Sequence, residues 1–388
     1  MLTAEEKQEL EKQQYRIIGS HSAVKVCGWT KKMVKGEGGC YKLKFYGIMS
    51  NQCMQMTTSI SCANRCSFCW RGYKAPVSKE WKWDVDDPQF ILQNSVNAHH
   101  NLLAGLKGYR NVNMPAYDAS RTVKHVALSL TGEPIIYPRI NELISSFNEK
   151  GISTFLVTNA QYPEQIRDLN TVTQLYISLD APNKELLKEI DVPLFSDFWE
   201  RLNQSLDYMK EKKHRTTIRL TLIKGMNDLE PENYAKLIMK GNPDFIEVKA
   251  YMFVGASRQR LSLENMPLHE DVVSFSQELI HSLPDYEIVS EHIPSRVVMM
   301  AKKKFNINGK WHTWIDFPKY HDLVLSGNEC ASMDYLKPTP QVGLSGKKTA
   351  DYAKQRLDRQ YKVDEKTSEL DFWNNEGKVQ LKGFDGII

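Results

Sequence analysis

Residues 61–70 read SCANRCSFCW and place Cys62, Cys66 and Cys69 in the spacing C-x3-C-x2-C. We call these three residues the first triad. Three thiols on so short a loop cannot all pair as disulfides, because one is always left over. A [4Fe-4S] cluster normally takes four cysteine ligands, so an isolated triad predicts a cluster whose fourth iron binds an exchangeable ligand. Chance clustering and a structural zinc site are the alternatives, although zinc usually takes four ligands and C-x2-C pairs.

Three more cysteines precede this loop, and we call them the second triad. Cys27, Cys40 and Cys53 each stand thirteen positions from the next. The first of them ends a β-like run, and the second follows a glycine-rich turn. So regular a set predicts ligands for a second cluster, with buried structural cysteines as the alternative. Cys330 stands alone in the C-terminal part, where we expect a buried thiol.

The composition indicates a cytoplasmic protein. The chain has 388 residues, 41% of them apolar, and a mean hydropathy of −0.48, so it can bury a large core. It has no apolar stretch of about eighteen residues that would cross a membrane and no apolar leader at its start. Seven cysteines, six of them close together, are typical of metal ligation in a reducing compartment rather than of a disulfide framework. The net charge of +4 is too small to indicate a nucleic-acid partner by itself.

From residue 52 onward, β-like and helix-like segments alternate. Strands are expected at residues 52–61, 124–130, 153–158, 174–179, 217–223 and 245–252. Helices are expected from Asp87-Pro88 onward and at residues 138–150, 183–189, 197–211, 231–239 and 269–282. Such alternation predicts a parallel α/β sheet with right-handed crossovers, and six units make an open, partial (β/α)6 barrel of the TIM type.

We expect the chain to be organised in three parts. Residues 1–51 form an N-terminal helix and the segment that binds the auxiliary cluster. Residues 52–286 form the barrel, and residues 287–388 form a C-terminal extension. The chemistry of such barrels lies at the C-terminal ends of the strands, which is where the first triad follows the first strand.

Polar residues also follow the later strands. Gly132 permits close backbone approach after the second strand, and Glu133 can accept a hydrogen bond from an ammonium group. The other polar residues expected at the barrel mouth are Thr131, Thr158, Asn159, Ser178, Asp180, Arg219, Thr221, Asn227, Glu247 and Lys249. An ordinary turn or cap explains any one of them, but it explains the whole set poorly.

The first triad, with aromatic Phe68 before its last cysteine, resembles the C-x3-C-x-aromatic-C motif of the radical S-adenosylmethionine (SAM) enzymes. In that superfamily SAM chelates the open iron, and an electron from the cluster cleaves SAM to methionine and a 5′-deoxyadenosyl radical. The Gly-Glu-Pro sequence at residues 132–134 is similar to the segment that holds the amino group of SAM. The resemblance implies SAM contacts by Thr131, Gly132, Glu133, Thr158, Asn159, Ser178, Asp180, Thr221 and Asn227.

A longer series of segments narrows the resemblance. CYKLKFYGI, SNQCMQMT, CWRG, SLTGEP, VTNA, ISLDAP, IKGMND and VKAYMFVGAS follow in this order between residues 40 and 257. Together with the second triad they resemble the tRNA 4-demethylwyosine synthases of wybutosine biosynthesis, over residues 24–322. This resemblance implies a radical SAM lyase that condenses pyruvate with N1-methylguanosine beside the anticodon of phenylalanine tRNA.

The same resemblance implies two [4Fe-4S] clusters, SAM, pyruvate and the tRNA anticodon loop as cofactors and partners. Eukaryotic members carry a flavodoxin-like domain, and too few residues precede Cys27 to form one. We therefore expect an archaeal-type enzyme with a separate electron-donor protein. Two other functions stay open: a two-cluster radical SAM enzyme acting on a peptide or small molecule, and an iron-sulfur RNA-binding protein without catalysis.

Two lysines beside the second triad are the candidate catalytic residues. Lys42 and Lys44 follow Cys40, and a lysine in a cationic or desolvated site becomes nucleophilic enough to form a Schiff base with the ketone of pyruvate. Contact with an RNA phosphate is the alternative for each. The lysine-rich residues 25–44 predict RNA binding, and Trp29, Trp70 and Tyr73 are candidates for stacking on an anticodon-loop base.

The two triads together predict a protein that holds about eight irons. Replacing the first triad with alanine should remove one cluster and all SAM cleavage. Replacing the second triad should remove the other cluster but leave some uncoupled cleavage of SAM. Iron analysis and detection of 5′-deoxyadenosine check both outcomes, and full iron content in either triple variant would contradict the assignment.

Overall fold

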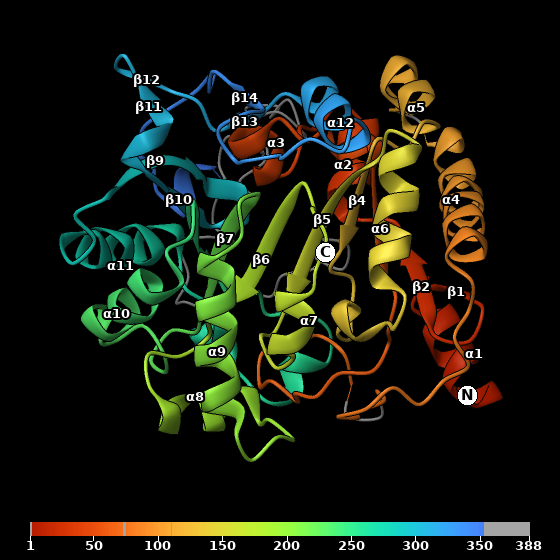
Figure 1. The fold of residues 1–388 in the computed structure, drawn as a ribbon, viewed down its shortest axis with the longest axis horizontal. Helices are drawn as coiled ribbons and strands as arrows, with labels where there is room; N and C mark the ends of the chain where they lie inside the picture. Colours follow the sequence, from red (N-terminus) through yellow and green to blue (C-terminus); the bar gives the residue numbers. More distant parts are fainter. Residues whose placement is uncertain (1, 73–74, 110, 353–388) are drawn as a thin grey trace, which may run out of the picture.

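The computed structural model describes residues 2–72, 75–109 and 111–352 (Figure 1). At its centre, six strands run parallel in chain order: β3 (Cys53–Thr57), β4 (His125–Leu128), β5 (Ser153–Thr158), β6 (Gln174–Ser178), β7 (Arg215–Leu222) and β8 (Phe245–Ala250). Each pairs with the next strand in the chain, and the ends of the sheet do not meet. The expected open, partial (β/α)6 barrel is therefore confirmed.

Antiparallel strands extend the sheet on both sides. These strands are β1 (Arg16–Ile18), β2 (Ser22–Lys25), β9 (Tyr286–His292) and β10 (Val297–Lys302). The full order is β1-β2-β3-β4-β5-β6-β7-β8-β10-β9. Strands from all three expected parts of the chain thus lie in one sheet, and the boundaries after residues 51 and 286 stay predictions.

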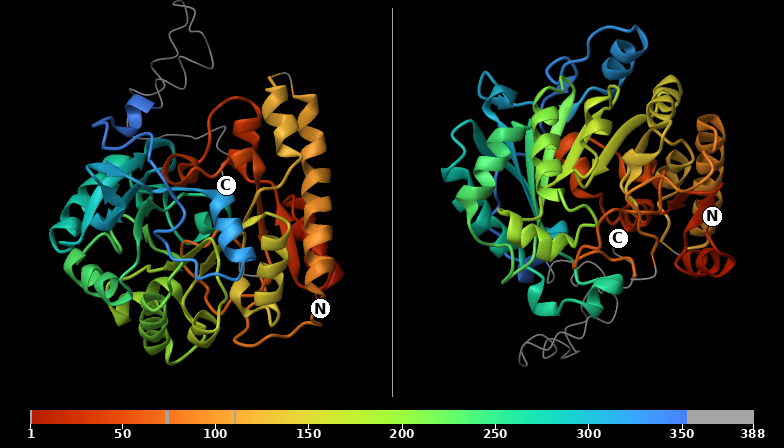
Figure 2. Two further views of the ribbon diagram at one scale, coloured as in Figure 1. Left: turned by 45° about the horizontal axis from the view of Figure 1, so that its top comes forward. Right: turned by 60° about the horizontal axis from the view of Figure 1, so that its bottom comes forward.

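Helices cover the outer face of this sheet (Figures 1 and 2). They are α4 (Pro88–Ala104), α6 (Ile140–Glu149), α7 (Pro163–Arg167), α8 (Lys184–Asp191), α9 (Phe198–Lys210), α10 (Pro231–Gly241) and α11 (His269–His281). The Asp87 carboxylate caps α4 by accepting from Gln89 N and Phe90 N. Alternate strand residues such as Ile246 and Val248 meet these helices in the larger core.

No helix in the described ranges combines the length and the apolar character that a membrane crossing requires. The expected N-terminal helix is α1 (Ala4–Lys12), which a capping box of Thr3 and Glu6 opens. The remaining elements lie at the margins of the barrel: α5 (Met114–Ser120), β11 (Asn306–Ile307), β12 (Lys310–Trp311), β13 (Trp314–Ile315), α12 (Phe317–Leu325) and β14 (Leu336–Lys337).

The inner face of the sheet carries a second core, which is rich in aromatic side chains. Phe155, Tyr176 and Phe245 come from three strands of the barrel. The short helix α3 (Tyr41–Tyr46) packs its buried residues against them. In Figure 1 this helix lies beside β13, β14 and α12, which close that end of the barrel. Helix α3 therefore fills the barrel interior, whereas the other helices cover its outside.

The segment around the second triad differs from the sequence expectation. The expected β-like run is present as β2 and the expected turn follows at residues 35–37, but the chain also forms the short helices α2 (Gly28–Val34) and α3, whose N-cap residues are Cys27 and Cys40. Both helices are short, and their aromatic and β-branched residues have low helix propensity. Burial of the α3 aromatic side chains in the inner core outweighs that propensity.

One glycine fixes the relation between the first two strand ends. Gly132 has φ +66°, and a Cβ atom there would lie 1.9 Å from Ser59 O. The next residue extends the contact, because Glu133 N donates to Ser61 O at 2.8 Å. Only glycine combines this backbone conformation with so close an approach. The loop after β4 is thus packed directly against the loop that carries the first triad.

Candidate active site

The first triad lies on the loop that follows β3, at the C-terminal edge of the parallel strands. The backbone of this loop pairs with the end of α8, where Arg65 N donates to Asp191 O at 3.0 Å. Within the loop, Cys69 N donates to Cys66 O at 3.0 Å and closes a turn. Hydrogen bonds of the main chain therefore fix the positions from which the thiols project.

Two guanidinium groups brace the same loop. Arg71 Nη1 donates to Ile60 O at 2.9 Å. Arg260, in the segment after β8, donates from Nε to Ser67 O at 2.8 Å and from Nη2 to Cys69 O. The loop is thus tied both to the end of β3 and to the far side of the barrel.

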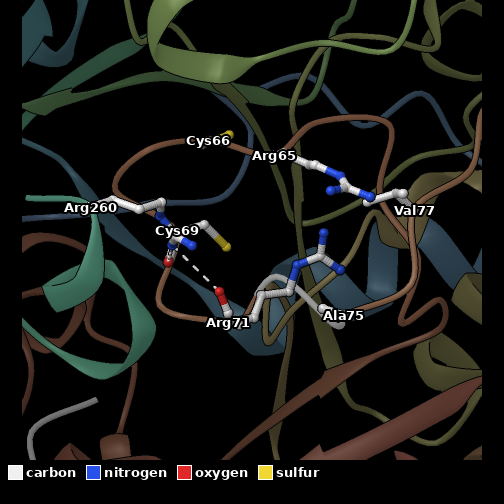
Figure 3. Close-up of a pocket in the computed structure, with 8 residues that line it drawn as sticks. Arg65, Cys66, Cys69, Arg71, Ala75, Val77 and Arg260 are labelled. Carbon is white, nitrogen blue, oxygen red and sulfur yellow. Dashed lines mark hydrogen bonds between the residues drawn. The ribbon is translucent and has the colours of Figure 1, made fainter.

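The arginines also surround the thiols with positive charge. A small cavity of about 20 Å³ opens here, and it is lined by Arg65, Cys66, Cys69, Arg71, Gly72, Ala75, Val77 and Arg260. In Figure 3 the Cys69 thiol and the Arg71 guanidinium both point into the space between the labelled residues. Burial alone would lower the pKa of Arg71, but the three thiols of the triad raise it above its usual value. The positive charge of the arginines therefore suits thiolates that bind a cluster at this site.

The donor set fits an iron-sulfur cluster. The cysteines of both triads are free thiols. Burial raises the pKa of Cys62 to about 11 despite the nearby Arg71, so a metal must displace its proton. Within the described residues, no three His, Cys, Asp or Glu side chains converge closely enough for a single metal ion. A four-iron cube binds each thiolate on a different iron, which spaces the ligands more widely than a zinc ion does.

Glu133 supplies an unused carboxylate oxygen beside the first triad. Its side chain is 1% exposed, and its Oε2 accepts from Asn159 N at 2.9 Å. Its Oε1 is buried and has no hydrogen-bond partner among the described residues. Burial raises the pKa of Glu133 to about 7, against the effect of the Asn159 N–H and of the Thr158 hydroxyl. An ammonium group bound here would satisfy Oε1, so the site fits the amino group of SAM.

Asn159 connects this carboxylate to the triad. Its backbone N–H contacts Glu133, and its Nδ2 donates to Cys62 Sγ at 3.4 Å. Thr158 is buried, and its Oγ1 accepts from Ala160 N at 3.2 Å. These two expected residues lie at the end of β5, next to both the thiol and the carboxylate.

The next two strand ends are held together by a buried amide. Asn227 Nδ2 donates to Asp180 O and to Thr221 O, both at 2.8 Å, and its Oδ1 accepts from Ile223 N at 2.6 Å. Asp180 Oδ1 in turn accepts from Thr221 N at 3.3 Å. Since the amide of Asn227 bonds only to the backbone, this residue braces the barrel mouth. Ser178 ends β6 in the same region and is half-buried.

Some neighbours of the triad were missed from the sequence. Asp191 is buried, its Oδ2 accepts from Asn64 Nδ2 at 3.2 Å, and it lies close to Cys66. Neither Asp191 nor Asn64 belongs to a motif or a periodic pattern from which a role could be predicted. Arg260 follows Gly255, where a Cβ atom would lie 2.4 Å from Trp70 O, but this close approach is visible only in the structure.

The aromatic residues expected to bind RNA have other contacts. The ring of Trp70 stacks on Tyr15 with 5.8 Å between centroids, and Lys25 Nζ lies 4.8 Å from the Trp70 ring. Trp29 is half-buried and meets His292 edge-on. Tyr73 lies outside the described residues. Trp70 is thus occupied within the protein, and Trp29 stays the better candidate for base stacking.

The second triad assembles from two helix N-termini and one strand. Cys27 and Cys40 cap α2 and α3, and Cys53 begins β3. Burial raises the pKa of Cys53 to about 12; the neighbouring Cys40 and Cys27 add to the rise, and Lys42 opposes it. Three half-buried cysteines that are far apart in the sequence therefore lie near one another on the inner side of the barrel.

The two candidate lysines project in different directions. Lys42 Nζ lies 4.5 Å from the centroid of the Tyr176 ring, and its charge acts on the second triad. Lys44 lies toward β9, where Glu291 counteracts the lowering of its pKa by burial. Residues two positions apart on a helix do not face each other. Only Lys42 is therefore brought to the second triad.

A layer of charged residues crosses the barrel interior between the two triads. Arg219 on β7 pairs in register with Glu247 on β8, and both side chains face inward. Tyr46 Oη donates to Glu247 Oε1 at 2.9 Å. Lys249 follows on the same strand, and burial lowers its pKa to about 8, with Arg219 adding to the effect. The interior is thus polar near the strand ends and aromatic below them.

Comparison with known families places this geometry in a class. The Radical SAM superfamily matches residues 56–238, and the family described as Wyosine base formation matches residues 240–302. The first match begins in β3 and includes the first triad and the strand ends through β7. The fold and the site are therefore those of the radical SAM proteins.

Individual relatives narrow the class to one family. The chain is 46% identical over 377 residues to the S-adenosyl-L-methionine-dependent tRNA 4-demethylwyosine synthase TYW1 of Xenopus laevis, covering 95% of this chain and 51% of that protein. It is 50% identical over 349 residues to the corresponding synthase of Oryza sativa subsp. japonica, covering 89% and 53%. The chain thus spans about half the length of the curated relatives it matches.

Two solved structures match over nearly their whole length. An archaeal TYW1 is 32% identical with a TM-score of 0.65, covering 80% of this chain and 99% of that one. A TYW1 with a lysine-pyruvate adduct bound is 35% identical with a TM-score of 0.71, covering 78% and 97%. The chain belongs to the tRNA 4-demethylwyosine synthase family.

Replacing Glu133 with Gln tests its place in the SAM site. Gln keeps the shape and can still accept from Asn159 N, but it loses the charge that would hold an ammonium group. A hydrogen bond to a charged group contributes about 1.5–3 kcal/mol, so SAM affinity should fall about 10- to 100-fold. Calorimetry on the reconstituted protein measures this, with exposed Glu164→Gln as the control for the same chemical change. Unchanged affinity at equal iron content would remove Glu133 from the site.

Proposed function

We propose that this protein is a radical SAM enzyme that converts N1-methylguanosine beside the anticodon of phenylalanine tRNA, with pyruvate, into 4-demethylwyosine. One observation carries the proposal: strand β3 begins at Cys53 of the second triad and leads into the loop of the first triad, with Glu133 beside the first triad and Lys42 beside the second. The relatives that match most of the chain support it, because each is named as an S-adenosyl-L-methionine-dependent tRNA 4-demethylwyosine synthase.

The first triad and the strand ends form the SAM half of the proposed site. A [4Fe-4S] cluster and SAM would supply the 5′-deoxyadenosyl radical there, a species strong enough to take hydrogen from an unactivated methyl group. Glu133 Oε1 would accept from the amino group of SAM. Asn159 and Asp180 would line the same pocket, and Arg71 would balance the negative charge of the thiolates.

The second triad and Lys42 form the pyruvate half. The second triad would hold a second [4Fe-4S] cluster, and Lys42 would bind the ketone carbon as a Schiff base. The structure of TYW1 with a lysine-pyruvate adduct bound supports a lysine in this role. Lys42 is favoured over Lys44 because Lys42 shares the barrel interior with the second triad, whereas Lys44 lies toward β9.

The tRNA would approach over the lysine-rich N-terminal segment. Lys32 and Lys35 lie over the rings of Trp29 and Tyr109, at 4.3 and 4.4 Å. Such paired cations and rings can contact phosphates and unstacked bases of a single-stranded loop. A separate electron-donor protein would deliver the electron for each SAM cleavage, and the cytoplasm would be the site of action.

Incubation with the complete set of substrates tests the proposed function. The reconstituted protein is kept under anaerobic conditions with SAM, pyruvate, a reductant and tRNA bearing N1-methylguanosine. We expect nucleoside mass spectrometry to detect 4-demethylwyosine, together with 5′-deoxyadenosine. Cleavage of SAM without change in the tRNA would favour a different substrate, and no cleavage at all would favour the RNA-binding alternative.

Borohydride trapping tests the role of Lys42. We expect labelled pyruvate to become fixed on the peptide that contains Lys42, because borohydride reduces an imine to a stable amine. Lys42→Arg should abolish trapping while it keeps the positive charge, and Lys44→Arg is the matched control that should trap normally. Label on Lys44, or equal trapping in both variants, would contradict the assignment.

A further inference from the structure

A buried carboxylate near the second triad takes no part in the proposed cluster and SAM sites. Glu247 on β8 is 0% exposed, and its Oε1 accepts from Tyr46 Oη at 2.9 Å. Its Oε2 is buried and receives no hydrogen bond within 3.5 Å from the described residues, although the Tyr41 hydroxyl lies close to the carboxylate. Leaving such an atom unpaired destabilises the fold, more so for a charged group, which calls for a functional reason.

Helix α3 brings Lys42 to this carboxylate. Lys42 and Tyr46 are four positions apart, so they lie on the same face of the helix. Since Tyr46 reaches Glu247, Lys42 projects into the same part of the interior, where its Nζ is 4.5 Å from the centroid of Tyr176. The groups that face Glu247 are Lys42, Tyr41 and Tyr46 from α3, Tyr176 from β6, Arg219 from β7 and Lys249 from β8.

The other buried carboxylates near the interior are engaged elsewhere. Asp180 accepts from the backbone of β7, and Glu133 lies at the barrel mouth beside the first triad. Glu291 accepts from His269 and from Ser345. Of these carboxylates, Glu247 alone combines an unpaired oxygen with a position facing Lys42.

We propose that Glu247 is a catalytic residue of the pyruvate half of the reaction, in which it delivers the proton that turns the Lys42 carbinolamine into an iminium ion. This inference rests on the proposed function and names the general acid of its pyruvate half. The Glu247 carboxylate that remains then faces the iminium cation, beside the aromatic side chains of the inner core. Tyr46 keeps the carboxylate in place by holding the other oxygen.

The free amine of Lys42 adds to the ketone carbon of pyruvate while Glu247 holds a proton. A proton then moves from the nitrogen to the former carbonyl oxygen, which becomes the carbinolamine hydroxyl. Glu247 gives its proton to this hydroxyl, the C–O bond breaks, and water leaves. The products are one iminium cation, one water and the Glu247 carboxylate, so no oxidant or reductant is needed.

Replacing Glu247 with Gln tests this role. Gln keeps the volume and can accept from Tyr46 Oη, but it cannot deliver the proton. We expect the rate of borohydride trapping of labelled pyruvate on Lys42 to fall at least about tenfold, which corresponds to about 1.4 kcal/mol in the barrier. Iron content and uncoupled SAM cleavage should stay at the wild-type level. Formic acid, a small proton donor, should restore part of the trapping rate in E247Q but not change it in the wild type.

The controls separate the failure of this inference from that of the proposed function. Glu287→Gln makes the same change on an exposed residue of β9 and should trap at the wild-type rate. Absence of trapping in the wild type would refute the Lys42 imine itself. Wild-type trapping with an unchanged rate in E247Q would overturn only the role of Glu247. If E247Q does not fold, Tyr46→Phe takes its place, and an unchanged trapping rate there would equally overturn the proposal.

Discussion

The burial of α3 against the inner face of the sheet is the contact on which the rest of the site depends. Tyr41, Phe45 and Tyr46 are buried there among the aromatic residues of the strands. Each such side chain contributes about 1.5–3 kcal/mol when it is fully buried. A helix of six residues would not form alone in water, so this packing, rather than propensity, holds Cys40 and Lys42 where they are.

The same packing explains why so many charged groups can stay inside the barrel. The guanidinium of buried Arg215 lies 4.4 Å from the ring of Phe245 and donates to Thr313 O, so an aromatic ring and a carbonyl oxygen stabilise its charge. Above it, Arg219 and Glu247 oppose each other on neighbouring strands. A buried charge is tolerated only when it is paired or hydrogen-bonded. Glu133 and Asp191 beside the first triad and Glu247 near the second each keep one buried oxygen without a hydrogen bond from the described residues, and these oxygens mark places that a ligand would complete.

Much of the barrel could be predicted from the sequence, and the parts that could not share a physical cause. Strand and helix alternation predicted β3 to β8 and the longer helices between them, because these elements follow regular hydrophobic patterns. The short helices α5 and α7 were not predicted. Helices α2 and α3 were missed, since tertiary burial overrides their poor local propensity. The clustering of the first triad was visible because its residues are adjacent in the chain. The contacts of Asp191, Arg260 and Glu247 depend on distant segments, and no local pattern predicts them.

Strand β3 sets the distance between the two halves of the site. Cys53 begins this strand, and the loop that bears the first triad leaves its other end. Five residues at about 3.3 Å each span roughly 13–17 Å, so the triads lie at opposite ends of a rigid element. A substrate bound near Lys42 would therefore lie below the barrel mouth, and the length of β3 sets its distance from the first triad. Because β3 pairs with β2 on one side and β4 on the other, this spacing is fixed by the sheet rather than by either bound group.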